Sequence, residues 1–184
     1  MNPTLNILGI SGSLRAQSRN TGLLRFAKQC LPPTVNFQIA DLADVPFYNA
    51  DHCDSKPESV QTLIRQVTEA DALVLACPEY NYSIAPALTN ALEWVSRDPD
   101  CAPFNGKPVA IVGAGGGMGT SRAQYHLRQV CVYLNLRPVN KPEVFSNAFS
   151  ASFNESGDLI DPSLQQQVTA LMNALLAWHS QLTK

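Results

Sequence analysis

The sequence predicts an α/β protein in which a doubly wound, five-stranded parallel sheet carries helices on both faces. Short apolar runs alternate with segments of helical periodicity along the whole chain. The run Ala72–Ala76 is apolar at every position, as expected of a strand covered on both faces. A length of 184 residues with 45% apolar content suits one domain that spans residues 1–184.

The individual elements follow from the same patterns. Strands are predicted at residues 5–10, 35–42, 72–76 and 108–112, and a fifth, short strand near 137–144. Leu23, Leu24, Ala27 and Leu31 recur at helical spacing after the first strand. Further helices are expected from a capping-box pattern at 55–58, over about 85–96, over about 121–134 with a second capping-box pattern at 121–124, and from the Asp161-Pro162 pair onward. Ligands of such sheets bind beyond the carboxyl ends of the strands, so the loops after strands one, three and four form the candidate site.

Composition excludes several classes of protein. A net charge of -2 argues against nucleic acid as a partner. No apolar run exceeds six residues and no signal peptide is recognisable, so we expect a cytoplasmic protein without a membrane span. The five cysteines are scattered, which indicates reduced thiols and neither a disulfide framework nor a metal site.

The loop after the first strand, residues 11–20, combines three serines, two arginines and an asparagine just before a helix. Hydroxyls, guanidinium groups and the free N–H groups of a helix N-terminus together suit a phosphate. An ordinary helix cap would explain Ser18 or Asn20 alone. The dinucleotide and P-loop glycine motifs are absent here, which favours a monophosphate such as that of FMN.

The loops after strands three and four suit a flat, partly polar heterocycle. Residues 78–83 place two tyrosines, an asparagine and a glutamate after the most buried strand. Residues 113–119 hold five of the ten glycines, and glycine lets backbone N–H groups approach a ligand. Donors fixed there would stabilise the negative charge that reduction places on a flavin ring.

These loops resemble the motifs of the NADPH-dependent FMN reductase family, flavodoxin-like flavoenzymes, and most nearly its bacterial chromate-, quinone- and azo-reducing branch. The resemblance rests on Gly-Ser-Leu-Arg-x-x-Ser-x-Asn at 12–20 and on Pro-Glu-Tyr-Asn-Tyr-Ser at 78–83, followed by Pro86, Leu88, Asn90, Ala91 and Trp94. It implies that the FMN phosphate is held by Ser11, Ser13, Arg15, Ser18 and Asn20. It implies flavin contacts from Pro78, Glu79, Tyr80, Asn81 and Ser83. The glycine run matches more loosely, and Gly115 and Gly116 are the contacts expected from it.

The function so implied is an NAD(P)H-dependent FMN oxidoreductase. Hydride would pass from NADPH or NADH to bound FMN, and two electrons would then pass to a quinone, free flavin, azo compound or chromate. No side chain is assigned as a catalytic nucleophile, and Glu79 is not assigned as an acid or base. The alternative is a flavodoxin-type electron carrier without nicotinamide activity, which a strongly acidic surface would favour. A flavin or quinone sensor without turnover is a third interpretation.

Members of the family generally form dimers or tetramers, so the resemblance implies a homodimer or homotetramer. Arg122 and Tyr125 lie three residues apart and therefore on one face of the predicted helix. Together with Glu143 they are predicted to form a polar cluster at the contact between subunits.

Overall fold

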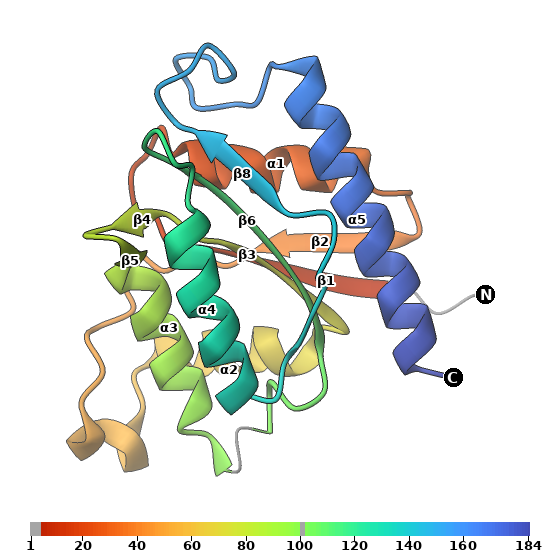
Figure 1. Ribbon diagram of the computed structural model, residues 1–184. Helices are drawn as coiled ribbons and strands as arrows, with labels where there is room; N and C mark the ends of the chain where they lie inside the picture. Colours follow the sequence, from red (N-terminus) through yellow and green to blue (C-terminus); the bar gives the residue numbers. More distant parts are fainter. Residues whose placement is uncertain (1–4, 100–101) are drawn as a thin grey trace.

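The computed structural model describes residues 5–99 and 102–184 and confirms the predicted α/β architecture. The central strands are parallel and ordered β2-β1-β3-β6-β7, and β8 also pairs with β6 (Figure 1). Their bounds are β1 (Leu5–Ser11), β2 (Val35–Ile39), β3 (Ala72–Ala76), β6 (Pro108–Gly115), β7 (Arg137–Pro138) and β8 (Val144–Asn147). An antiparallel hairpin of β4 (Glu79–Tyr80) and β5 (Ser83–Ile84) follows β3.

Helices cover both faces of the sheet, as predicted (Figure 1). One face packs against α1 (Arg19–Cys30) and α5 (Pro162–Leu182). The other packs against α2 (Glu58–Glu69), α3 (Pro86–Ser96) and α4 (Ser121–Tyr133). Because side chains alternate along a strand, Leu73 and Leu75 of β3 face α2, α3 and α4, whereas Val74 faces α1 and α5. Both faces of β3 are therefore buried, which explains its uniformly apolar sequence.

Several strands differ from the predicted ones, and β1 ends one residue later than predicted, at Ser11. β2 ends at Ile39 and not at 42, although the Ala40 N–H still bonds to the Gly9 carbonyl (2.9 Å). β6 continues three residues past the predicted end because β8 pairs with it from Val112 to Gly115. The predicted fifth strand is two strands, since β7 pairs with the start of β6 and β8 with its end. Pro142 lies between them and has no N–H to donate to a ladder.

Both predicted capping boxes are wrong. Ser55 ends the 3-10 helix η1 (Ala50–Ser55), and α2 begins after Pro57, which makes no side-chain cap bond. Ser121 lies inside α4, whose N-cap is Thr120. The Gln124 side chain donates to Thr120 Oγ1 and to the Val144 carbonyl, each at 2.9 Å, and so ties α4 to β8. The predicted start at Asp161 is confirmed, because its Oδ1 accepts from the Ser163 N–H at 2.8 Å.

The four described cysteines are free thiols, as the sequence predicts, and Cys101 lies outside the described residues. Burial raises the pKa of Cys77 and of Cys131 to about 12, so both remain protonated near neutral pH. In the described residues no helix is long and apolar enough to cross a bilayer.

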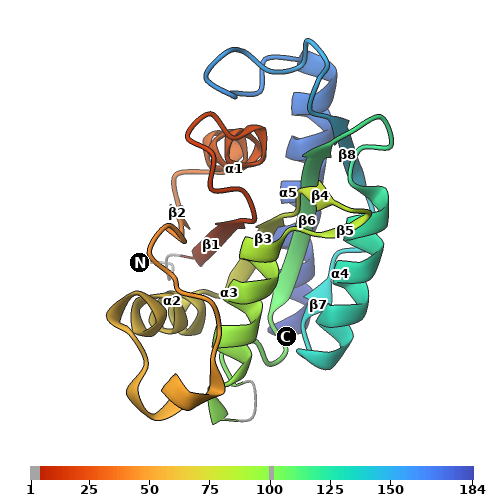
Figure 2. The same ribbon diagram turned by 90° about the vertical axis from the view of Figure 1, so that its left-hand side faces the viewer.

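The order of the strands fixes where a ligand can bind. From the centrally placed β1 the chain moves outward to β2 and then crosses to β3 on the other side of β1. The loops that follow β1 and β3 therefore leave the sheet in opposite directions and open a crevice between them. Those loops and the one after β6 gather at the same end of the sheet (Figure 2).

The loop between β8 and α5 is fastened to α1. The Arg25 Nε donates to Asp158 Oδ1 at 2.6 Å, and Gly22 of α1 packs directly against Gly157. A Cβ built on Gly22 would lie 1.8 Å from the Gly157 carbonyl oxygen. Gly157 itself has a φ of +79°, which favours glycine there as well.

We expect Gly22→Ala to lower the free energy of unfolding by about 2–3 kcal/mol, because the added methyl group collides with backbone that cannot move aside. Urea unfolding of the purified protein measures this. The control is Gly117→Ala, where a Cβ meets no atom within 4 Å. Equal unfolding midpoints for the two variants would contradict the packing described.

Candidate functional site

A cavity of about 350 Å³ lies at the carboxyl ends of β1, β3 and β6. The three loops that the sequence analysis singled out all contribute to it. The residues that line it are Ser13, Arg15, Ser18, Arg19, Asn20, Pro78, Glu79, Tyr80, Ala114, Gly115, Gly116, Ala148 and Phe149.

Nine of the twelve predicted contact residues are brought together in this cavity: Ser13, Arg15, Ser18, Asn20, Pro78, Glu79, Tyr80, Gly115 and Gly116. Ser11 is buried behind the loop, and Asn81 and Ser83 lie farther along the hairpin. Ala114, Ala148 and Phe149 were missed, and Arg19 was counted only among the loop's cations. Contact with the cofactor stays a prediction for all twelve.

Internal hydrogen bonds hold the loop of residues 12–18 in shape. The Ser18 hydroxyl caps α1 by accepting from the Thr21 N–H at 3.1 Å. The Thr21 hydroxyl donates to Ser11 Oγ at 3.0 Å, and the Ser13 N–H donates to the same oxygen at 3.3 Å. Ser11 and Ser18 therefore support the loop, while the first-turn amides of Arg19 and Asn20 have no carbonyl within the helix to bind.

The Asn20 side chain links two of the loops. Its Nδ2 donates to the Ala114 carbonyl and its Oδ1 accepts from the Ala114 N–H, both at 2.9 Å and both buried. This pair fixes the N-terminus of α1 against the end of β6. The side chain is thereby engaged within the protein, and only the backbone N–H of Asn20 is left for a ligand.

Arg19 has a buried hydrogen-bond donor that an anionic ligand would satisfy. Its Nε is buried and has no hydrogen-bond partner among the described residues. A buried donor without an acceptor costs about 1–3 kcal/mol, so such a group marks a site that a ligand completes. Arg15 lines the same cavity from the exposed side of the loop, which places two guanidinium groups beside the α1 N-terminus.

The hairpin after β3 is fixed to α4 by a carboxylate. The Glu79 side chain is only 5% exposed, and it accepts from Arg122 Nε at 2.7 Å and from the Ala123 N–H at 3.3 Å. Hydrogen bonding to this carboxylate raises the pKa of Arg122. The same guanidinium lies 3.6 Å above the Tyr82 ring.

The hairpin turn itself needs left-handed backbone at Asn81 and Tyr82, whose φ angles are +50° and +64°. This is the pattern of a type I′ turn, in which asparagine is favoured. Asn81 is not among the residues that line the cavity, while the half-exposed Tyr80 is.

In the glycine loop, residues 113–119, some glycines are required by the turn and others leave backbone open at the cavity. A Cβ on Gly115 would lie 2.4 Å from the Gly119 carbonyl, so glycine is required there by the fold. The Gly119 N–H closes the turn by donating to the Gly116 carbonyl at 2.8 Å. A Cβ on Gly116 would meet nothing, so its surface faces open space at the cavity.

Within the described residues no group of three His, Cys, Asp or Glu side chains is placed to hold a metal ion. The cavity is instead lined by cations, hydroxyls, amides and aromatics, which are the groups that bind a phosphate and a flat heterocycle.

The sheet order β2-β1-β3-β6-β7, with the donor-rich loop of residues 11–20 at the point where it reverses, defines a flavodoxin-like protein. The chain belongs to the NADPH-dependent FMN reductase family, whose sequence profile matches residues 5–151. This membership makes it an oxidoreductase that uses FMN and a reduced nicotinamide nucleotide, and so decides for the enzyme over the electron carrier.

Individual relatives agree with this assignment. An NAD(P)H-dependent FMN reductase of Pseudomonas aeruginosa is 43% identical over 180 residues, which cover 97% of each chain. The quinone reductase of Escherichia coli is 35% identical over 179 residues, covering 95% of each chain. The flavoenzyme FerB of Paracoccus denitrificans, an NAD(P)H:acceptor oxidoreductase, superposes with a TM-score of 0.86 at 25% identity, covering 96% of this chain and 98% of its own.

The residues present fit FMN. The unpartnered Arg19 Nε, the free first-turn amides and the Ser13 hydroxyl suit its phosphate. Tyr80 and the open surface of Gly116 suit the edge and face of its ring.

We expect Arg19→Ala to raise the dissociation constant for FMN roughly tenfold or more, because a charged hydrogen bond to the phosphate is lost. Fluorescence titration of the apoprotein measures it. Riboflavin, which lacks the phosphate, should bind both proteins equally, and Arg65→Ala on the exposed surface of α2 is the control variant. An equal loss of affinity for riboflavin would show that Arg19 acts on the fold and not on the phosphate.

Proposed function

We propose that this chain is a quinone reductase that uses NADH or NADPH as its reductant. The observation that carries the proposal is the cavity at the ends of β1, β3 and β6, whose lining combines Arg19, with its unpartnered Nε, and the aromatic residues Tyr80 and Phe149. Relatives 35–41% identical to this chain, from Escherichia coli, Arabidopsis thaliana and rice, are named quinone reductases or NADPH:quinone oxidoreductases.

The cofactor would be anchored by its phosphate. Arg15, Arg19 and Ser13 would hold the phosphate oxygens, together with the first-turn amides of α1. FMN, when bound, supplies the chemistry of accepting hydride and donating electrons. The protein supplies position and field, and none of the lining side chains is needed as a nucleophile.

Two aromatic side chains suit a planar acceptor. Tyr80 on the hairpin is half exposed, and Phe149 after β8 is 79% exposed. The backbone that carries Phe149 is fixed by two hydrogen bonds: its N–H donates to Asn147 Oδ1 at 2.8 Å, and the preceding Ala148 N–H donates to the Gly115 carbonyl at 2.6 Å. Aromatic surface beside the cavity favours flat, conjugated acceptors such as quinones. Free flavin, azo compounds and chromate are proposed as further acceptors, since the open mouth selects weakly by shape.

The test is anaerobic addition of NADH or NADPH to the FMN-loaded protein, followed by a quinone. We expect the visible absorbance of the bound flavin to disappear with the nucleotide and to return stoichiometrically with the quinone. Bleaching that a quinone does not reverse would contradict the quinone as acceptor, and absorbance that never changes would contradict the whole proposal.

We also propose that the chain forms a homodimer or homotetramer through the outer face of α4. Tyr125 and Val132, one heptad apart, are both exposed on this helix and place two large apolar side chains on one face. Arg122 and Glu143, predicted to join Tyr125 in a polar contact, have partners within their own chain. Arg122 binds Glu79, and Glu143 accepts from Lys141 Nζ at 2.6 Å, which lowers the pKa of Glu143.

We expect the double variant Tyr125→Asp, Val132→Asp to sediment as a monomer, because burying two carboxylates in an apolar contact is unfavourable. Sedimentation velocity gives the size. The matched control is Phe47→Asp, an exposed aromatic in the loop after β2. Unchanged size in the double variant would place the subunit contact elsewhere.

A further inference from the structure

A second cavity, of about 270 Å³, lies beside the first one, between the loop after β1 and the loop after β2. Ser13 and Arg15 line both cavities, so the loop of residues 12–18 forms the wall between them. The polar residues that line only the second cavity are Ser11, Thr21 and Asp41, and they are joined by apolar side chains that include Leu14 and Ile39. Apart from Ser11, Ser13 and Arg15, none of its lining residues is among the predicted FMN contacts.

We propose that the second cavity binds the adenosine-diphosphate-ribose end of the reduced nicotinamide nucleotide, with Asp41 accepting hydrogen bonds from the ribose hydroxyls. This inference rests on the proposed function, because that function requires a nicotinamide nucleotide to reach the first cavity. A nucleotide whose ring enters the first cavity must place its other end within one molecular length, and a neighbouring cavity with a common wall meets that condition.

The geometry of Asp41 favours a diol. Its Oδ1 accepts from the Ala43 N–H at 2.9 Å, which holds the carboxylate in one orientation. In the described part of the chain its Oδ2 has no partner, and the residue is exposed to solvent at the cavity. A carboxylate accepts hydrogen bonds from two adjacent hydroxyls, as the acidic residue of dinucleotide-binding folds does with ribose.

The other groups of the cavity match the rest of the nucleotide. Arg15 is the only cation in its lining, and the position between the two cavities lets one guanidinium neutralise phosphates on both sides. Leu14, although apolar, is 61% exposed, and with the half-buried Ile39 it offers an apolar surface for a purine. Charge, hydroxyl acceptor and apolar wall are thus the three parts that a nucleotide end needs.

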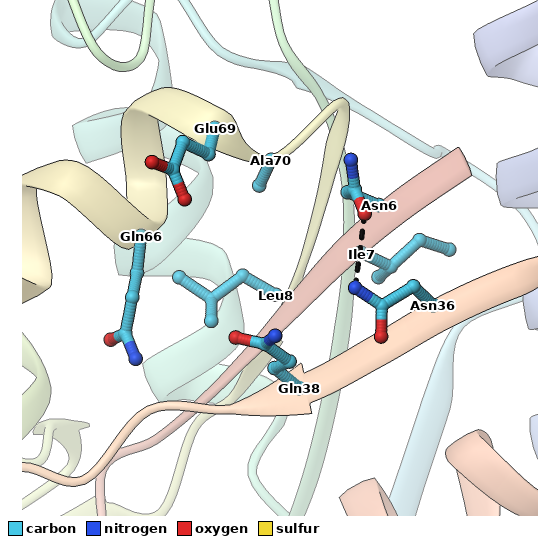
Figure 3. Close-up of a pocket in the computed structure, with 8 residues that line it drawn as sticks. All are labelled: Asn6, Ile7, Leu8, Asn36, Gln38, Gln66, Glu69 and Ala70. Atoms are coloured by element: carbon cyan, nitrogen blue, oxygen red, sulfur yellow. Dashed lines mark hydrogen bonds between the residues drawn. The ribbon is translucent and has the colours of Figure 1, made fainter. Parts of the chain in front are cut away.

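Other features are less suited to this role. Arg97 is held at 2.6 Å by Glu93 and lies over the Tyr48 ring, away from both cavities. The amide-lined cavity of Figure 3 measures only about 90 Å³. It lies beside Asn6 at the start of β1, where Asn36 Nδ2 donates to Asn6 Oδ1 at 3.0 Å. Asn6 is five residues, or roughly 17 Å of extended strand, from Ser11 at the other end of β1.

Asp41 also sets a preference between the two nucleotides. A carboxylate beside the ribose repels the 2′-phosphate of NADPH and accepts the free 2′-hydroxyl of NADH. The site therefore favours NADH, and replacing the carboxylate by an uncharged amide shifts the preference toward NADPH.

The test is isothermal titration of the FMN-loaded protein with ADP-ribose and with 2′-phospho-ADP-ribose, using Asp41→Asn. We expect the variant to bind ADP-ribose about tenfold more weakly, to bind the phosphorylated probe more tightly, and to bind FMN as the wild type does. The ratio of kcat/KM for NADPH to that for NADH should rise in parallel. Asp44→Asn, an exposed aspartate in the same loop but outside the cavity lining, is the matched control.

Three results would overturn the inference: Asp41→Asn and Asp44→Asn behaving alike, wild-type protein not binding ADP-ribose, or Asp41→Asn losing FMN affinity. The last result would assign the cavity to the cofactor. The titration needs no turnover, so its outcome is independent of the flavin reduction assay. ADP-ribose binding that depends on Asp41, in a protein whose flavin neither nucleotide reduces, would support the site and contradict the proposed function alone.

Discussion

The exchange of two buried hydrogen bonds between the Asn20 side chain and the backbone of Ala114 is the constraint on which the site depends. It joins the N-terminus of α1 to the C-terminal end of β6. The hydrogen bonds of the sheet do not themselves connect these two segments. A buried amide without partners costs about 1–3 kcal/mol, so the two ends stay together. One residue further on, the Gly115 carbonyl accepts from the Ala148 N–H at 2.6 Å, which brings the loop after β8 into the same assembly. The Asn20–Ala114 pair and the Ala148–Gly115 bond together link the loop of residues 12–18, the glycine loop and the loop that carries Phe149.

The arginines discussed above fall into two groups: those that pair with a carboxylate of the protein and those that do not. Arg25, Arg97 and Arg122 each bind a carboxylate and tie elements together: a loop to α1, one turn of α3 to the next, and the hairpin to α4. Arg15 and Arg19 line the cavity and have no such ion pair in the described chain. Because the Glu79 carboxylate is already committed to Arg122, the negative charge in the lining does not offset these two cations. The field in the cavity is therefore positive where a phosphate would bind, although the chain as a whole carries a net charge of -2.

The sequence predicted what local patterns determine. The apolar strand at Ala72–Ala76, the donor-rich loop and the glycine run each carry their signal within about ten residues, and the parallel sheet brings them to one end. Contacts between segments far apart in the chain could not be predicted from these local patterns. Phe149 enters the cavity only because β8 pairs in register with the end of β6, and Glu79 turns inward because Arg122 lies 43 residues later. The family resemblance assigned Asn20 and Ser11 to the ligand, whereas the structure uses their side chains to connect and support the loops.

The composition of residues 11–20 is explained by a loop with two surfaces. A single phosphate monoester has three terminal oxygens, and the first-turn amides of α1, the Ser13 hydroxyl and the Arg19 guanidinium already match them. The side chains of Ser11 and Ser18 accept hydrogen bonds from backbone N–H groups of the loop and of the first turn of α1. Arg15 adds a further cation to this phosphate site, and it also stands in the wall that the first cavity shares with the second. A cation in a shared wall lowers the repulsion between two anionic ligands bound on opposite sides, so a nucleotide can bind beside a phosphorylated cofactor without displacing it.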